Sequence, residues 1–182
     1  MPRRAQAAPP PTAYQRALRR LARRDHSVAE LRRALVERGH ESGEVEAALE
    51  RLRRERYLDD AGFAERFARS RMQHQGLGSI RIRQGLRQRG VDRGATDAGI
   101  AGALREVDER EVLDGLARRY WRQHAGVEPA LRLPRLWAFL LRRGFAPGIV
   151  RGRLCGLWPR WRDALDGLEP AEPAESHAGE RE

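Results

Sequence analysis

Apolar residues recur every three or four positions along most of this chain, a spacing that places them on one face of a helix. The clearest runs, both in the first third of the sequence, are Leu31, Ala34 and Leu35, then Val45, Ala48, Leu49 and Leu52. The strict alternation of apolar and polar residues that marks a half-buried strand does not occur. The pattern therefore predicts an all-α protein.

The predicted helices repeat in register about a glycine. The chain reads LVERGH at 35–40, LRQRGV at 86–91 and LLRRGF at 140–145, and the three glycines stand 51 and 54 residues apart. Apolar residues occupy equivalent positions in the three copies: Leu31, Ile82 and Leu136; Leu35, Leu86 and Leu140; Leu49, Ile100 and Leu154. Internal repeats of this length are typical of elongated helical arrays, in which each unit contacts only its neighbours.

An arginine precedes each of these glycines, giving the pairs Arg38 and Gly39, Arg89 and Gly90, and Arg143 and Gly144. Glycine is favoured directly after a helix, because the residue there often adopts a left-handed conformation that a side chain penalises. Arginine is favoured near the carboxyl end of a helix by the helix dipole. We interpret the pairs as helix ends and the leucine four residues before each glycine as a buried anchor; direct binding by the arginines is the alternative.

Further residues mark where helices start. Ser27 followed by Glu30 predicts a capping box, and Asp60 is the expected N-cap of a helix that follows it. Pro134 is tolerable in a first turn, which places the start of that helix near Leu133.

These observations predict an all-α, elongated array of three tandem three-helix repeats resembling helix-turn-helix units. The expected divisions are a disordered head at 1–12, repeats at 13–57, 58–107 and 108–166, and a disordered acidic tail at 167–182. The ends are expected to be disordered because their Pro-rich and Glu-rich composition offers little apolar surface to bury.

The charge is unevenly distributed. All 36 basic residues are Arg, and the net charge is +10. Residues 13–65 carry twelve Arg against eleven acids, but 66–91 carry seven Arg and 130–162 eight, with no acid in either block. A GC-rich genome also favours Arg, so the location of the charge is more informative than its amount. The two acid-free blocks predict an anionic partner.

In the middle unit, Arg83 and Arg87 stand four residues apart beside the apolar stripe of their helix. The equivalent positions are Arg32 and Val36 in the first unit and Trp137 and Leu141 in the third. Two like charges at this spacing repel each other, so an anionic ligand would stabilise them. The alternative is that both guanidinium groups extend to solvent over apolar surface. The candidate residues for binding DNA or a partner are Arg81, Arg83, Arg87, Arg89, Arg142 and Arg143.

Nothing in the sequence favours an enzyme. The histidines lack metal-ligand spacing, Cys155 is the only cysteine, and no Gly-rich phosphate loop follows a strand. Asp59 and Asp60 form an adjacent carboxylate pair, which is weak evidence for acid–base catalysis. We therefore expect no catalytic residue, no metal and no cofactor. No apolar run reaches the length of a membrane span, and the expectation is a soluble, cytoplasmic chain without membrane contact.

Four stretches resemble the RecX family of bacterial recombination regulators. They are ALRRLARRDHSVAELRRALVERG at 17–39, YLDDAGFAERFARSR at 57–71, GSIRIRQGLRQRGV at 78–91 and LLRRGFAPGIVRGRL at 140–154. The likeness covers about residues 14 to 158.

The resemblance implies three three-helix units that bind the RecA recombinase and lodge in the groove of its filament on single- or double-stranded DNA. It also implies suppression of the recombinase's ATPase, strand-exchange and coprotease activities by a monomer. The alternative from the residues alone is a basic helical DNA-binding transcription regulator, although a single helix-turn-helix does not explain three copies in register.

Overall fold

The structure, a computed structural model, describes residues 10–159, and within them the only regular elements longer than a single turn are α-helices. The helices are α1 (Ala13–Leu21), α2 (Val28–Val36), α3 (Ser42–Arg54), α4 (Asp60–Gln75), α5 (Ser79–Gln88), α6 (Arg93–Glu106), α7 (Glu109–Gln123), α8 (Pro129–Arg142) and α9 (Pro147–Leu157). The predicted acidic tail at 167–182 and most of the predicted head at 1–12 lie outside the described residues.

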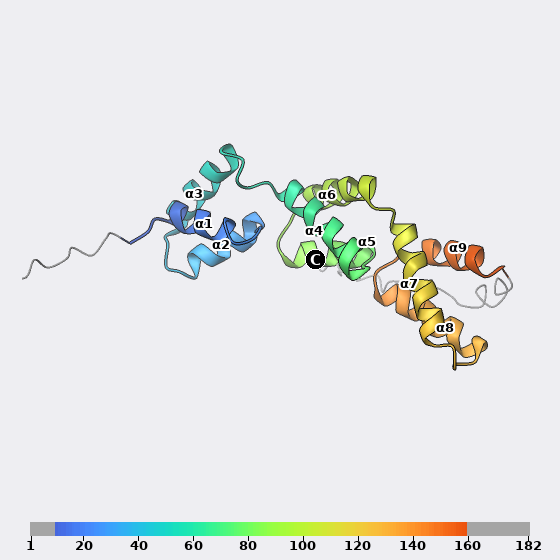
Figure 1. Cartoon of the computed structure of the whole chain (residues 1–182). Coiled ribbons are helices and arrows are strands. Elements are labelled where there is room, and N and C mark those ends of the chain that lie inside the picture. Colours follow the sequence, from blue (N-terminus) through green and yellow to red (C-terminus); the bar gives the residue numbers. More distant parts are fainter. Residues whose placement is uncertain (1–9, 160–182) are drawn as a thin grey trace, which may run out of the picture.

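The helices form three groups in a row, α1 to α3, α4 to α6 and α7 to α9 (Figure 1). Each group has its own hydrophobic core. The nine apolar positions that repeat in the sequence are all buried, and none is more than 4% exposed. The prediction of an elongated all-α array of three-helix units is therefore confirmed.

The predicted glycine caps are present in all three units. Gly39, Gly90 and Gly144 have φ of +82°, +72° and +89°, the left-handed region that a side chain disfavours. The N–H after each glycine donates to the carbonyl of the anchor leucine, as His40 to Leu35 (3.3 Å), Val91 to Leu86 (3.1 Å) and Phe145 to Leu140 (3.3 Å). The leucine and the glycine of each copy thus belong to one helix-ending motif.

The predicted capping box at Ser27 forms only in part. The Ser27 hydroxyl accepts a hydrogen bond from the N–H of Glu30 at 3.1 Å. The Glu30 carboxylate instead pairs with Arg24 at 3.0 Å. A nearby guanidinium has therefore replaced the backbone N–H as the partner of that carboxylate.

The prediction that Asp60 is an N-cap is wrong by one residue. Asp59 caps α4 and accepts the N–H of Ala61 at 3.0 Å. Asp60 is the first residue inside α4, and its carboxylate accepts the N–H of Val28, at the start of α2, at 2.9 Å. These contacts give both aspartates structural roles.

The predicted start of α8 near Leu133 is also wrong, because α8 begins at Pro129 and contains Pro134 in its interior. Pro129 occupies the first turn, where an N–H has no helical partner to lose. The extra turn is held by Arg132, which is buried and donates to the carbonyls of Ala125 and Val127 in the preceding loop.

Neighbouring units are joined by the same contacts twice. Asp60 caps α2 of the first unit, and Glu109, the first residue of α7, accepts the N–H of Ser79 at the start of α5 at 2.6 Å. The carbonyls of Arg89 and Arg143 also accept a hydrogen bond from the preceding unit: Ser27 Oγ to Arg89 (2.6 Å) and Gly78 N–H to Arg143 (2.9 Å). In the second and third units, the Arg-Gly pair therefore ends a helix and joins two units.

Candidate partner-binding surfaces

Three of the six candidate arginines lie at the joints between units. The Arg89 guanidinium lies 4.6 Å from the centre of the Phe67 ring and 3.6 Å from the Glu30 carboxylate of the first unit. Arg143 donates to the carbonyl of Gln75, at the end of α4, at 2.5 Å. The backbone of Arg81 packs directly against Gly144. The side chains of Arg89 and Arg143 therefore help to hold neighbouring units together, and the backbone of Arg81 packs in the joint between the second and third units.

Arg83 has an acidic partner that is distant in the sequence. Its guanidinium pairs with Asp97 of α6. The same positions of the first unit hold Arg32 and Glu46, joined by two hydrogen bonds of 2.6 and 2.9 Å. The ion pair is thus a feature of the repeat, and Arg83 is partly neutralised before any ligand binds.

Arg81, Arg87 and Arg142 differ from the other three. All three are exposed, and none of their guanidinium groups makes an ion pair or a hydrogen bond with any residue in the range 10–159. The structure therefore does not bring the six candidate arginines together in one site; it separates three free guanidinium groups from three engaged ones.

Arg83 and Arg87 line a groove between α5 and α6. Its volume is about 500 Å³, and Arg93 adds a third guanidinium to its rim. Ile80, which is 44% exposed, supplies apolar surface beside these charges, and the buried Val91 lies at the base of the groove. A groove that combines cations with apolar surface can receive an acidic protein segment that also carries aliphatic side chains. We name this the α5–α6 groove.

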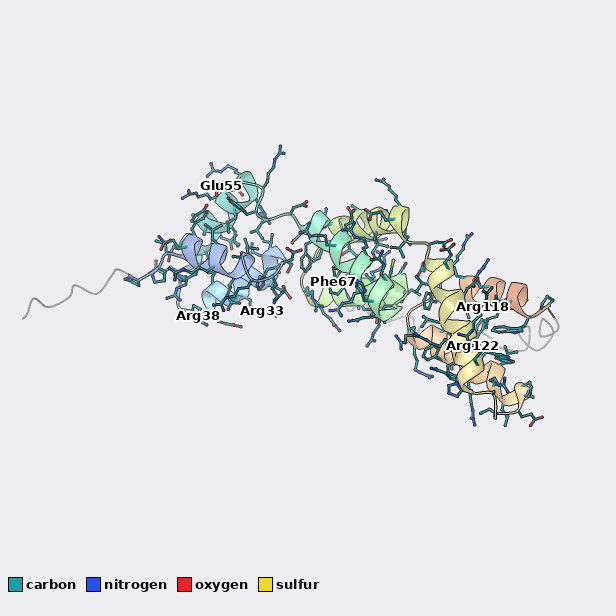
Figure 2. The ribbon with its side chains drawn as sticks, viewed as in Figure 1. Arg33, Arg38, Glu55, Phe67, Arg118 and Arg122 are labelled. Atoms are coloured by element: carbon teal, nitrogen blue, oxygen red, sulfur yellow. The ribbon has the colours of Figure 1, made fainter. Side chains whose placement is uncertain are left out.

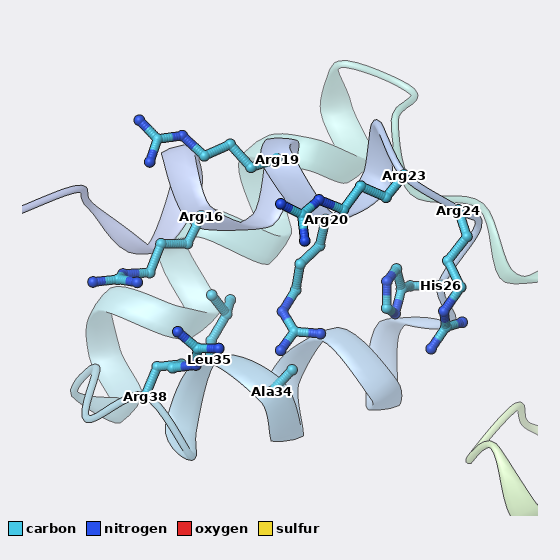
Figure 3. Close-up of a pocket in the computed structure, with 9 residues that line it drawn as sticks. All are labelled: Arg16, Arg19, Arg20, Arg23, Arg24, His26, Ala34, Leu35 and Arg38. Atoms are coloured by element: carbon cyan, nitrogen blue, oxygen red, sulfur yellow. The ribbon is translucent and has the colours of Figure 1, made fainter.

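Sequence reasoning missed a second basic groove, between α1 and α2 (Figure 3). Its volume is about 540 Å³, and no acid is among its lining residues, which are Arg16, Arg19, Arg20, Arg23, Arg24, His26, Ala34, Leu35 and Arg38. Because this part of the chain holds twelve Arg and eleven acids, its composition gave no signal. The available signal was the spacing of arginines three and four apart along α1. We name this the α1–α2 groove.

His26 lies at one end of the α1–α2 groove and is buried. Its Nδ1 lies 3.5 Å from a Glu30 carboxylate oxygen but has no hydrogen-bond partner within residues 10–159. Burial, and then the charge of Arg24, lowers the pKa of His26, although Glu30 opposes the shift. The imidazole is therefore neutral near pH 7, and the arginines supply the positive charge of the groove.

Exposed arginines also occur on the third unit. Figure 2 shows Arg118 and Arg122 on α7, while Arg33 and Arg38 project from the first unit.

Within the described residues, no cluster of three or more His, Cys, Asp or Glu could hold a metal ion. None of the helices between residues 10 and 159 combines the length and apolar character needed to span a bilayer.

Comparison with known proteins identifies two of the three units directly. Residues 13–52 match the model of the first three-helix domain of RecX, and residues 59–100 match that of the second. The regulatory protein RecX of Halorhodospira halophila is 46% identical over 141 residues, covering 74% of this chain and 81% of the relative. That of Trichlorobacter lovleyi is 35% identical over 146 residues, covering 78% and 93%.

Solved structures agree with the fold. RecX from Lactobacillus salivarius superposes with a TM-score of 0.72 at 18% identity, covering 80% of this chain and 94% of that one. A crystal structure of another regulatory protein RecX superposes with a TM-score of 0.67 at 26% identity, covering 75% of this chain and 67% of that one. With two domain models matched in order and relatives aligned along most of their length, this chain belongs to the RecX family.

Proposed function

We propose that this chain binds the RecA recombinase filament on DNA and inhibits its ATPase, strand-exchange and coprotease activities. The proposal rests on membership of a family whose relatives are named regulatory proteins. The structural observation that supports it is the arrangement of three units in a row (Figure 1), each of which carries exposed arginines. An extended array of this kind suits a filament better than a compact ligand, because each unit can meet a successive part of a repeating partner.

The α5–α6 groove is the contact that we assign to the recombinase. Its mixture of guanidinium groups and apolar side chains resembles the composition of protein interfaces, where Arg is enriched beside buried apolar contacts. In this proposal the chain acts in the cytoplasm as a monomer, without a cofactor and without catalysing a reaction. Inhibition then follows from occupancy of the filament rather than from chemistry.

The test is a titration of the full chain into the cognate recombinase on single-stranded DNA while ATP hydrolysis is measured. We expect hydrolysis to fall and to saturate as the chain occupies the filament. Unchanged hydrolysis at concentrations where the chain co-sediments with filaments would reject the inhibitory function. A defined footprint on duplex DNA in the absence of recombinase would favour a transcription regulator instead.

A further inference from the structure

The α1–α2 groove concentrates positive charge that no acid in residues 10–159 neutralises, apart from Glu30 beside Arg24. Of its six arginines, only Arg24 has an acidic partner among the described residues, and that partner is Glu30. The side chains of the other five make no ion pair or hydrogen bond with any residue in the range 10–159; they are Arg16, Arg19, Arg20, Arg23 and Arg38. Guanidinium groups held this close repel one another, so the groove attracts an anion.

Three acids of the first unit are paired outside the groove. Glu46 pairs with Arg32, Glu55 pairs with Arg51, and Asp25 pairs with Arg66 of the second unit. Folding thus places these three acids in ion pairs away from the groove, while five groove arginines have no acidic partner within residues 10–159.

One donor within the groove lacks an acceptor. The Nε of Arg16 is buried and has no hydrogen-bond partner within residues 10–159. Buried donors in proteins are nearly always paired, so an unpaired one in the wall of a charged groove calls for a ligand that accepts hydrogen bonds. Figure 3 shows Arg20 extending from α1 toward α2, with Arg38 on the opposite side. An anion in the groove would be contacted from both helices.

The lining distinguishes a nucleic acid from an acidic protein. The only apolar residues in the groove are Ala34 and Leu35, and both are buried in the core. A protein ligand needs buried apolar or aromatic anchors for affinity, and this groove offers none, unlike the α5–α6 groove. Phosphate backbones are bound mainly by neutralisation of charge. Arginines four apart on α1 are about 6 Å apart along the helix axis, a spacing that allows successive contacts with one strand.

We infer that the α1–α2 groove binds the phosphodiester backbone of a nucleic acid strand, with Arg16, Arg19, Arg20, Arg23 and Arg38 neutralising successive phosphates. This inference deepens the proposed function, on which the choice of nucleic acid as the polyanion partly rests. In this arrangement the α1–α2 groove of the first unit binds the nucleic acid, and the α5–α6 groove of the second unit contacts the recombinase.

The test uses the full chain with a fluorescent oligothymidylate or a duplex of random sequence, without recombinase, across a salt series. The groove variant combines Arg19→Gln, Arg23→Gln and Arg38→Gln, all at exposed positions, so folding is retained. The matched control combines Arg33→Gln, Arg53→Gln and Arg54→Gln, which remove the same charge from exposed positions of the same unit outside the groove. Circular dichroism confirms the fold of both variants. A variant with Arg16→Gln and Arg20→Gln tests the inner wall.

For the groove variant we expect an affinity loss of about tenfold or more, and a log–log salt slope shallower by about 2 on single strands, or about 3 on duplex. The control should lose much less. Equal losses in the two triple variants, an unchanged slope, or no binding of either oligomer by the wild-type chain would each overturn the inference. Competition by polyglutamate as strong as that by the oligomer would reassign the groove to an acidic protein. Because recombinase is absent, failure here leaves the ATPase test of the proposed function unaffected, and the reverse also holds.

Discussion

The Asp60 carboxylate accepts a 2.9 Å hydrogen bond from the backbone N–H of Val28, so the second unit caps a helix of the first. Glu109 caps Ser79 in the same way, at 2.6 Å, between the second and third units. A helix begins with N–H groups that have no partner within the helix, and in α2 and α5 one of these groups is satisfied by the next unit. The caps therefore couple the stability of neighbouring units.

Replacement of Asp60 by Ala should destabilise the chain by about 1 to 3 kcal/mol, because the N–H of Val28 is left without this acceptor. Asp60→Asn should cost less, since its amide oxygen can still accept the hydrogen bond. Urea unfolding at neutral pH measures both. An equal loss in the two variants would contradict a hydrogen-bonding role for this side chain.

The cost of Asp60→Asn should also depend on pH. Burial raises the pKa of Asp60, although the Val28 hydrogen bond opposes the shift. In the range above the ordinary carboxyl pKa, the folded chain holds a proton that the unfolded chain has released, so the contribution of Asp60 to unfolding free energy falls as pH rises. Asn does not titrate, so the variant should gain stability relative to the wild type as the pH rises above the ordinary carboxyl pKa of about 4. Parallel stability curves for the two proteins would refute this.

Two glycines with the same backbone conformation should respond differently to substitution. Gly39→Ala meets only the left-handed φ of +82°, with no atom within 4 Å of the added Cβ, and should cost about 1 to 2 kcal/mol. At Gly144 the added methyl would also overlap Arg81 across the joint between α5 and α8. Gly144→Ala should therefore cost more and should loosen the third unit, which small-angle X-ray scattering would detect as a larger radius of gyration. Equal effects of the two substitutions would disprove the packing role of Gly144.

Leu35, Leu86 and Leu140 should be equivalent anchors. Each has no exposed surface, so substitution by Ala should cost about 2 to 5 kcal/mol through lost burial and the cavity left behind. Val36→Ala is the control, because Val36 is 52% exposed and should change stability little. A thermal melt unaffected by any one of the three leucine substitutions would place that unit outside the repeat.

The two arginines of the α5–α6 groove should contribute unequally to filament binding. Arg87 has no acidic partner within residues 10–159, whereas Arg83 already pairs with Asp97. Arg87→Gln should weaken binding more than Arg83→Gln, and Arg83→Gln should change stability by less than about 1 kcal/mol, as exposed ion pairs do. Filament binding by each variant across a salt series gives the comparison. A larger loss of filament affinity from Arg83→Gln than from Arg87→Gln would show that Arg83, not Arg87, is the main contact.

The same salt series distinguishes the ligand of Arg87. If it contacts a phosphate, Arg87→Gln should make the log–log slope shallower by about 0.7 to 0.9. If it contacts the recombinase through the apolar part of the groove, affinity should fall with little change in slope.

The sequence by itself determined the helices, the three-fold repeat, the buried leucines and the glycine caps. These features follow from local rules: helical spacing selects the buried face, and a left-handed helix end selects glycine. The predicted anchors Leu35, Leu86 and Leu140 are buried for this reason. The start of α8 was misplaced because Arg132, which holds the first turn, acts through loop carbonyls that periodicity does not reveal.

Only the tertiary structure decided which charges are free. Arg83 looked unpaired in the sequence because its partner Asp97 lies on another helix. The first unit looked neutral because its acids and arginines are nearly equal in number, yet within residues 10–159 folding pairs Glu46, Glu55 and Asp25 elsewhere and leaves five arginines of the α1–α2 groove without an acidic partner. Electrostatic interaction depends on distance in space, and distance in space between side chains on different helices is fixed by packing rather than by order along the chain.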